Sequence, residues 1–100
     1  MKKFINSVEN VENEMLQGML KAYPGKLRKL DCGNVIVRKV KKEGKVAIIT
    51  GGGSGHEPSS LGFCGKGWEC IKVIGDVFAA PSPKAVLDGL MMADRGKGIL

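Results

Sequence analysis

The chain has 100 residues, of which 43% are hydrophobic and 26% are charged, and its formal net charge is +6. This length fits one small domain or part of a larger one, and the balance of residue types excludes a disordered or collagen-like chain. No apolar run reaches the length of a membrane span, and three cysteines without a C-x-x-C pair favour reduced thiols in a cytoplasmic protein over a disulfide framework.

The first predicted element is an amphipathic helix, because apolar residues from Ile5 to Leu20 recur at spacings of three and four. Asn6, with Glu9 three residues later, has the pattern of a capping box at its start. The stretch Tyr23-Pro24-Gly25 is predicted to end it.

Three strand candidates follow. The stretch KLRKLDC is the weakest, and NVIVRKV is richer in β-branched residues. After a Glu43-Gly44 turn, KVAIIT is a continuous apolar run, which predicts a central strand covered on both faces.

A short basic cluster spans the end of NVIVRKV, the turn and the start of KVAIIT. It comprises Arg38, Lys39, Lys41, Lys42 and Lys45. A basic chain suggests nucleic-acid binding, but the sequence has a single Trp and a single Tyr and so offers no ladder for stacked bases. A solvated basic face is the simpler interpretation, and we expect no nucleic-acid partner.

The second half predicts alternating helices and strands. HEPSSLGFCGKG is predicted to form a short helix, CIKVIGDVF a strand, and SPKAVLDGLMMADRG a helix with Ser82 as N-cap, Pro83 as first residue and Gly96 as stop. The final Gly-Ile-Leu resembles the opening of another strand. This order predicts an α/β fold, with a mixed or mostly parallel sheet flanked by helices, in a domain that is cut short.

Between Ala47 and Ser60 the sequence AIITGGGSGHEPSS contains four glycines within Gly51–Gly55. A glycine-rich loop after a strand and before a helix can turn several N–H groups towards a phosphate, a carboxylate or a polarised hydroxyl. The carboxyl end of a strand is also where open α/β sheets bind ligands. A tight turn without a ligand is the alternative, but the only histidine of the chain, His56, follows at once and favours a site.

This run does not match the common glycine motifs. The dinucleotide fingerprint fails because His56 occupies the position of its last glycine, and the phosphate loop fails at Gly65-Lys66, where Gly67 follows. The serine nucleophile elbow around Ser54 fails by one residue, and the only histidine lies too close in sequence to act as its usual partner.

A histidine can exchange a proton near neutral pH, so His56 is a candidate general base, although it could also only brace the loop. Glu57 could orient the ring, but charging the first turn of the next helix is the simpler role. His56, Cys64 and Cys70 are zinc ligands by type without a paired spacing, so we expect no metal site.

The stretch GDVFAAPSPKAV adds two further candidates. Asp76 is either an acid at a strand end or an ordinary turn residue, and the residues alone leave both open. Phe78 is expected to pack rather than to stack on a ligand.

Three stretches in order, GGGSGHEP, GFCGKG and GDVFAAPSPKAV, resemble the amino-terminal part of the dihydroxyacetone kinase family. In particular, it is similar to the substrate-binding K subunit of bacterial systems and to the equivalent region of single-chain ATP-dependent kinases. The K subunit has two α/β domains, so this resemblance implies that the chain is the truncated first domain of a two-domain subunit. It extends over essentially all 100 residues. Residues 1–100 are therefore expected to be the amino-terminal part of a dihydroxyacetone-binding kinase domain, and an incomplete one.

The resemblance implies phosphoryl transfer to a hydroxyl of dihydroxyacetone. His56 would accept the proton of that hydroxyl, and Gly53, Ser54, Gly55 and His56 would contact the substrate. No cofactor is expected in this chain. The resemblance implies that ATP or ADP with Mg²⁺ lies on a separate domain or L-type subunit, or that a phosphotransferase-system protein donates the phosphate.

In the family, a histidine that binds the substrate covalently and a lysine and an aspartate of the pocket lie downstream of Leu100. Full-length K subunits pair, so a homodimer is expected. The isolated chain is expected to bind the ketose weakly and to show no measurable turnover. The alternative function is a non-catalytic, dihydroxyacetone-sensing co-activator of the same fold.

Overall fold

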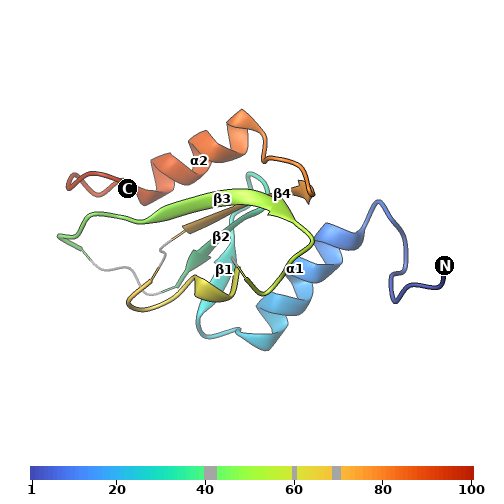
Figure 1. Cartoon of the computed structure of the whole chain (residues 1–100). Coiled ribbons are helices and arrows are strands. Elements are labelled where there is room, and N and C mark those ends of the chain that lie inside the picture. The colour runs from blue at the N-terminus through green and yellow to red at the C-terminus, as the bar shows by residue number, and fades with distance from the viewer. Residues whose placement is uncertain (40–42, 60, 69–70) are drawn as a thin grey trace.

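The computed structural model describes residues 1–39, 43–59, 61–68 and 71–100. It places a mixed sheet between two helices, with α2 above the sheet and α1 below it in the view of Figure 1. The elements in chain order are α1 (Val11–Ala22), β1 (Leu27–Lys29), β2 (Val35–Arg38), β3 (Ile49–Ser54), the 3-10 helix η1 (Leu61–Phe63), β4 (Ile71–Val77) and α2 (Pro83–Ala93). The predicted α/β class with a mixed sheet is confirmed.

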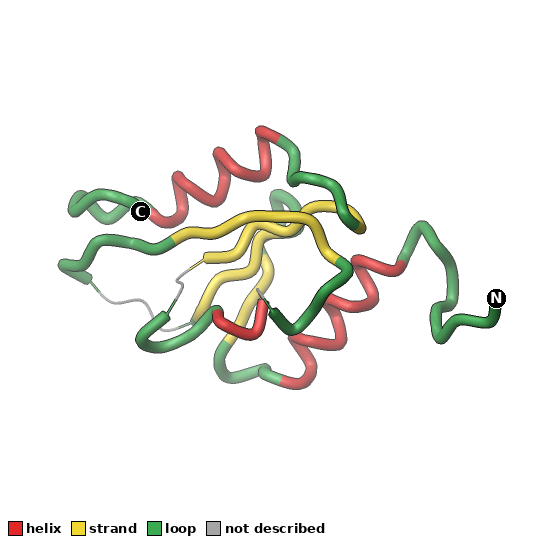
Figure 2. Tube along the Cα trace, viewed as in Figure 1, coloured by secondary structure: helices red, strands yellow, loops and turns green. Residues whose placement is uncertain are grey.

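The strands lie side by side in the order β1-β2-β4-β3 (Figure 2). β1 and β4 are antiparallel to β2, whereas β3 and β4 run parallel. The prediction that KVAIIT forms a central strand is therefore corrected, because β3 is the last strand of this sheet and begins only at Ile49.

Where the sequence predicts the opening of another strand, residues 94–100 form an isolated bridge and not a strand. Ala47 forms a parallel bridge with Ile99, the N–H of Leu100 donates to the carbonyl of Ala47 at 2.8 Å, and the N–H of Ile49 donates to the carbonyl of Leu100 at 2.9 Å. These bonds lie on the side of the β3 segment that faces away from β4 and extend the sheet there.

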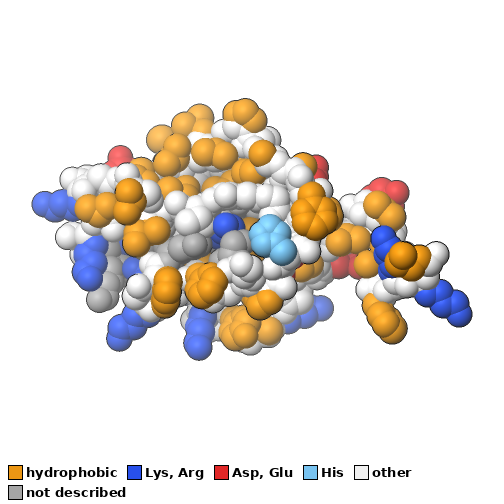
Figure 3. All heavy atoms as spheres, in the orientation of Figure 1, with side chains coloured by type: hydrophobic (Ala, Val, Ile, Leu, Met, Phe, Trp, Pro, Cys, Tyr) orange, Lys and Arg blue, Asp and Glu red, His pale blue; other side chains and the backbone are white. Residues whose placement is uncertain are grey.

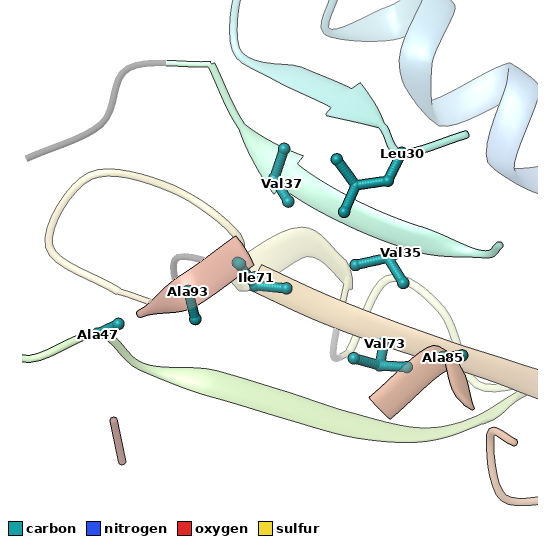
Figure 4. Packing of buried hydrophobic residues seen from close by; sticks show 8 residues of the cluster. All are labelled: Leu30, Val35, Val37, Ala47, Ile71, Val73, Ala85 and Ala93. Atoms are coloured by element: carbon teal, nitrogen blue, oxygen red, sulfur yellow. The ribbon is translucent and has the colours of Figure 1, made fainter. Parts of the chain in front are cut away.

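The sheet is covered on both faces because successive side chains of a strand point to opposite sides. Val35 and Val73 pack towards α2 in one apolar cluster, shown in Figure 4. Ile36 and Ile74 pack on the other face with Leu16 of α1, which is fully buried. Burial on both sides fixes β2 and β4 in the middle of the domain.

α2 begins as the sequence predicts. The Ser82 hydroxyl accepts the backbone N–H of Ala85 at 3.2 Å, and Pro83 is the first helical residue. The helix ends at Ala93, three residues before the expected stop at Gly96.

α1 begins later than predicted, at Val11 with Asn10 as its N-cap, so the capping box of Asn6 and Glu9 is wrong. The side chain of Asn6 instead donates to Glu14 at 2.9 Å. Val8 is 75% exposed, and a turn formed there would bury no apolar face. The end of α1 at Tyr23 is confirmed.

The helix predicted for HEPSSLGFCGKG is reduced to the single turn of η1. Glycines 62, 65 and 67 weaken any longer helix in this stretch. Ser60 of this stretch and Lys41 and Lys42 of the basic cluster lie outside the described residues. Among the helices of the described part, none is long and apolar enough to cross a bilayer.

Candidate functional site

The candidate site lies at the carboxyl ends of β3 and β4, which are parallel neighbours. Gly53 pairs with Gly75, and the next pair joins Ser54 to Val77, so Asp76 is an extra residue that bulges from β4. The predicted glycine loop is thus corrected: residues 51–54 belong to β3, because β4 supplies partners for their backbone. Only residues 55–59 form the loop that follows.

Gly53 and Gly75 lie against the backbone of the segment that follows β4. A β-carbon at Gly53 would lie 2.8 Å from the nitrogen of Ala79, and one at Gly75 would lie 2.2 Å from the oxygen of Ala79. Neither atom is the flexible end of a side chain, so both positions require glycine. Residues 79–81 therefore lie flat on the ends of the two strands.

His56 lies just beyond β3 with an exposed side chain, and the single pale-blue ring in Figure 3 lies on the open surface. Gly55 enters the turn with φ +117°, a value that favours glycine, and its N–H donates to the Glu57 carboxylate at 2.9 Å. The carbonyl of His56 accepts the N–H of Ser59 at 3.2 Å. Glu57 closes this turn and does not charge a helix, since none begins there.

Phe78 lies directly beside this turn. Its ring stacks on the His56 imidazole with the centroids 6.4 Å apart and the planes at 9°. Its backbone N–H donates to the carbonyl of Ser54 at 2.8 Å. The expectation that Phe78 packs is wrong, because the residue is 80% exposed and its ring lies against the candidate base.

Ser54 has a buried side chain, exposed by only 2%, and its hydroxyl has no hydrogen-bond partner within the described residues. The hydroxyl is closed off from solvent. A buried hydroxyl without a partner is costly, so this atom marks a place where a further polar group would be accommodated.

Asp76 approaches α1 as well as the site. The Glu12 carboxyl accepts the side-chain N–H of Asn34 at 2.5 Å and lies beside the Asp76 carboxyl. Burial, together with this neighbouring carboxyl, raises the pKa of Glu12, and the bond from Asn34 opposes the rise. Asp76 lies near the end of β4, and its carbonyl accepts the N–H of Ala79 at 3.0 Å in the turn that follows, so its role as an acid stays a prediction.

Lys72 is a buried cation that the sequence analysis did not single out. It is 4% exposed, and its ammonium donates to the Thr50 hydroxyl at 3.0 Å. A single lysine within the otherwise apolar start of the CIKVIGDVF stretch was the feature of the sequence that could have indicated it. Lys72 pairs with Thr50 in the register of β3 and β4, four residues before Ser54.

The zinc arrangement is not formed by the described residues. No group of three or more His, Cys, Asp or Glu side chains among them could hold a metal ion. Cys64 is buried in the apolar cluster below the sheet, and Cys70 lies outside the described residues.

Two hollows lie away from His56. One of about 740 Å³ lies between α1 and the loop after β3, with Met19 and Leu61 in its wall. The other, of about 220 Å³, lies beside Trp68 and two residues of the predicted basic cluster, Arg38 and Lys45. Neither has His56 in its wall, so the local geometry of the strand ends, and not the size of a cavity, identifies the candidate site.

Comparison with known proteins agrees with the family resemblance of the sequence. The family model described as the Dak1 domain matches residues 17–100. The chain is 39% identical over 100 residues to the dihydroxyacetone-binding subunit DhaK of a PTS-dependent dihydroxyacetone kinase from Listeria innocua, covering all of this chain and 30% of that protein. It is 37% identical over 97 residues to the DhaKLM operon coactivator DhaQ of Lactococcus lactis, covering 97% of this chain and 29% of that protein.

Among solved structures, the dihydroxyacetone kinase from C. freundii in complex with AMP-PNP and Mg²⁺ superposes with a TM-score of 0.85 at 37% identity. The match covers 97% of this chain and 18% of that one. The chain therefore spans less than a third of the length of these relatives.

Proposed function

Because the chain belongs to the Dak1 domain family, we propose that it forms the dihydroxyacetone-binding side of a kinase that phosphorylates a hydroxyl of this ketose. The observation that carries the proposal is the exposed imidazole of His56, held at the carboxyl end of β3 next to Gly55. The name of the Listeria innocua relative supports the choice of substrate.

In the proposed reaction, a hydroxyl oxygen of dihydroxyacetone attacks the phosphorus of the donor while the imidazole of His56 takes the hydroxyl proton. A new O–P bond forms, and the bond from phosphorus to the donor breaks with its electron pair leaving on the donor. Gly53, Ser54, Gly55 and His56 would contact the small polyol-like substrate. A base within hydrogen-bond reach of the attacking hydroxyl contributes about 10²–10⁴ in rate.

We propose that the phosphoryl donor is bound by another domain or subunit. We also propose that the full-length protein is a homodimer, in which each copy would receive its phosphoryl group from such a domain or subunit. The C. freundii kinase, which superposes on this chain, was solved with AMP-PNP and Mg²⁺, and the match covers only 18% of that protein. The chain's own task is then to bind the ketose, to orient it and to accept its proton. Phosphoryl transfer otherwise depends mainly on positioning and charge stabilisation.

The test is His56→Ala, with His56→Gln as a second variant, in the protein that carries this chain, assayed with dihydroxyacetone and its donor. We expect kcat to fall by about 10²–10⁴ with the circular dichroism spectrum unchanged. Lys21→Gln, which removes a charge from the exposed end of α1, is the control and should leave kcat unchanged. Turnover that survives in both His56 variants would remove the proposed role.

A second candidate, a ligand-sensing co-activator, is favoured by the similarity to the DhaQ coactivator. It predicts dihydroxyacetone binding without phosphoryl transfer in any combination of donor components. Calorimetric titration with dihydroxyacetone, followed by the same kinase assay on the wild type, separates the two candidates.

A further inference from the structure

We propose that Phe78 is a positioning residue that holds the His56 imidazole in the orientation needed to accept the substrate proton. The inference deepens the proposed function and depends on it. It concerns a side chain that reaches the site from β4, 22 residues after His56.

The backbone of Phe78 is in an uncommon conformation. Its φ is +54°, in the left-handed region that bulky residues rarely adopt. Two hydrogen bonds hold it there: the N–H of Phe78 donates to Ser54 at 2.8 Å, and the N–H of Ala79 donates to Asp76 at 3.0 Å. Such a conformation persists where its surroundings determine it, and it is concentrated at functional sites.

The ring gains little from burial. Residues 79–81 lie flat on the strand ends because Gly53 and Gly75 carry no side chain, and the Phe78 ring projects outward with 80% of its surface exposed. Because the ring stays in water, the free energy of burying it cannot offset the strain of the Phe78 backbone. Its contacts must therefore be sought on the surface.

Those contacts are His56 and Gly55. The Phe78 and His56 rings are nearly parallel, at 9°, with a centroid separation of 6.4 Å, within the range of offset aromatic pairs. A β-carbon at Gly55 would lie 3.2 Å from Cζ of Phe78. Gly55 therefore leaves room for the ring as well as providing the turn.

The imidazole has no hydrogen-bond partner among the residues that the structure describes, so the stack is the contact that limits rotation of its ring. When His56 takes the hydroxyl proton, its ring nitrogen must face the substrate. Phe78 should thus favour this productive orientation of the imidazole. Its loss should lower kcat more than it raises KM.

The test uses Phe78→Leu and Phe78→Tyr in the protein that carries this chain, with dihydroxyacetone and its donor. We expect Phe78→Leu to lower kcat by about 3- to 10-fold, the effect of one aromatic pair, with KM within about twofold. Phe78→Tyr, which keeps the ring, should restore kcat. In NMR spectra, the ring protons of His56 should move on Phe78→Leu as the ring current is lost, and stay in place in Phe78→Tyr.

Phe78→Gly separates positioning from folding. Glycine adopts the left-handed region without strain, so the urea midpoint should be unchanged or higher while kcat falls as in Phe78→Leu. Phe4→Leu is the matched control, because Phe4 lies in the amino-terminal segment and is fully exposed. It should change neither kcat nor the His56 spectrum.

Failure of this inference and failure of the proposed function give different results. If His56→Ala abolishes turnover while Phe78→Leu and Phe78→Gly keep the wild-type kcat, the positioning role is overturned and the function stands. The same holds if Phe78→Tyr is as slow as Phe78→Leu. If His56→Ala itself keeps turnover, the proposed function fails, and the role of Phe78 fails with it.

Discussion

Glycines on the two sides of β3 meet different surroundings. On one side, here called the closed side, Gly53 lies opposite Gly75 and both touch the backbone of residues 79–81. On the other side, the open side, a β-carbon at Gly52 would have nothing within 4 Å. Gly53 therefore allows close approach of the chain itself, whereas Gly52 leaves an open surface. Successive residues of a strand face opposite sides, and this alternation determines which glycine has which role.

The contrast changes how the motif is understood. A glycine-rich stretch beside a candidate base suggests that every glycine makes room for a ligand. At Gly53 the room is already taken by the chain itself, and at Gly52 it is open. Single substitutions can separate the two roles, because the closed side should respond in stability and the open side in binding.

The largest effect is expected for Gly75→Ala on the closed side. The new β-carbon would lie 2.2 Å from the Ala79 oxygen and 2.6 Å from the Pro81 nitrogen, and both are backbone atoms. Relief requires residues 79–81 to move away from the strand ends, at a cost of about 3 kcal/mol in the free energy of unfolding. Urea denaturation measures this loss, with Gly25→Ala, which meets nothing within 4 Å, as the control. If Gly75→Ala is as stable as that control, residues 79–81 do not pack tightly against Gly75.

Gly53→Ala should cost less, about 1–2 kcal/mol, because its closest contacts are longer, at 2.8–3.0 Å from atoms of Ala79 and Phe78. Since Phe78 is among them, the stack on His56 should be disturbed as well. Urea denaturation gives the stability, and the NMR shifts of the His56 ring protons report the stack. Loss of stability without any change at His56 would separate the packing of Gly53 from the site.

Much of the fold could be predicted from the sequence because its signals are local. β-branched residues mark β2, and the pair Ser82-Pro83 sets the start of α2. The start of α1 could not be predicted, because it depends on which apolar residues are buried in the folded protein, and Val8 is exposed. A capping box describes a possible first turn and carries no information about burial.

The site could be predicted in part. His56 and the neighbouring glycines stand out as residue types, but the inclusion of Gly51–Gly53 in β3 depends on pairing with β4, more than 20 residues later. The same distance hides the contact between Phe78 and His56. Non-local pairing of this kind leaves no periodic signal in the sequence.

On the open side, Gly52→Ala should change the free energy of unfolding by less than about 1 kcal/mol, the usual cost of exchanging glycine and alanine at an unstrained position. If the ketose lies against this bare strand, the added methyl should weaken dihydroxyacetone binding, which calorimetric titration of the purified protein measures. Gly25→Ala again serves as the control. Binding equal to that of the wild type would place the ligand away from Gly52.

The smallest effect is expected where α1 meets the bulge beside Gly75. Since the pKa of Glu12 is raised by burial and by Asp76, the folded protein holds this proton more tightly than the unfolded chain does. Stability from this group is therefore greatest at low pH and falls as the pH rises from about the ordinary value of 4.5 to the raised one.

Glu12→Gln keeps an oxygen for Asn34, offers an N–H to Asp76 and has no proton to lose. Its stability relative to the wild type should rise between pH 4 and pH 7, by less than about 0.5 kcal/mol because the group is partly exposed. Urea midpoints of both proteins across this range measure the difference, and Glu9→Gln, which removes a charge from an exposed position, is the control. If the difference between Glu12→Gln and the wild type stays constant with pH, burial beside Asp76 does not raise the pKa of Glu12 in the folded protein.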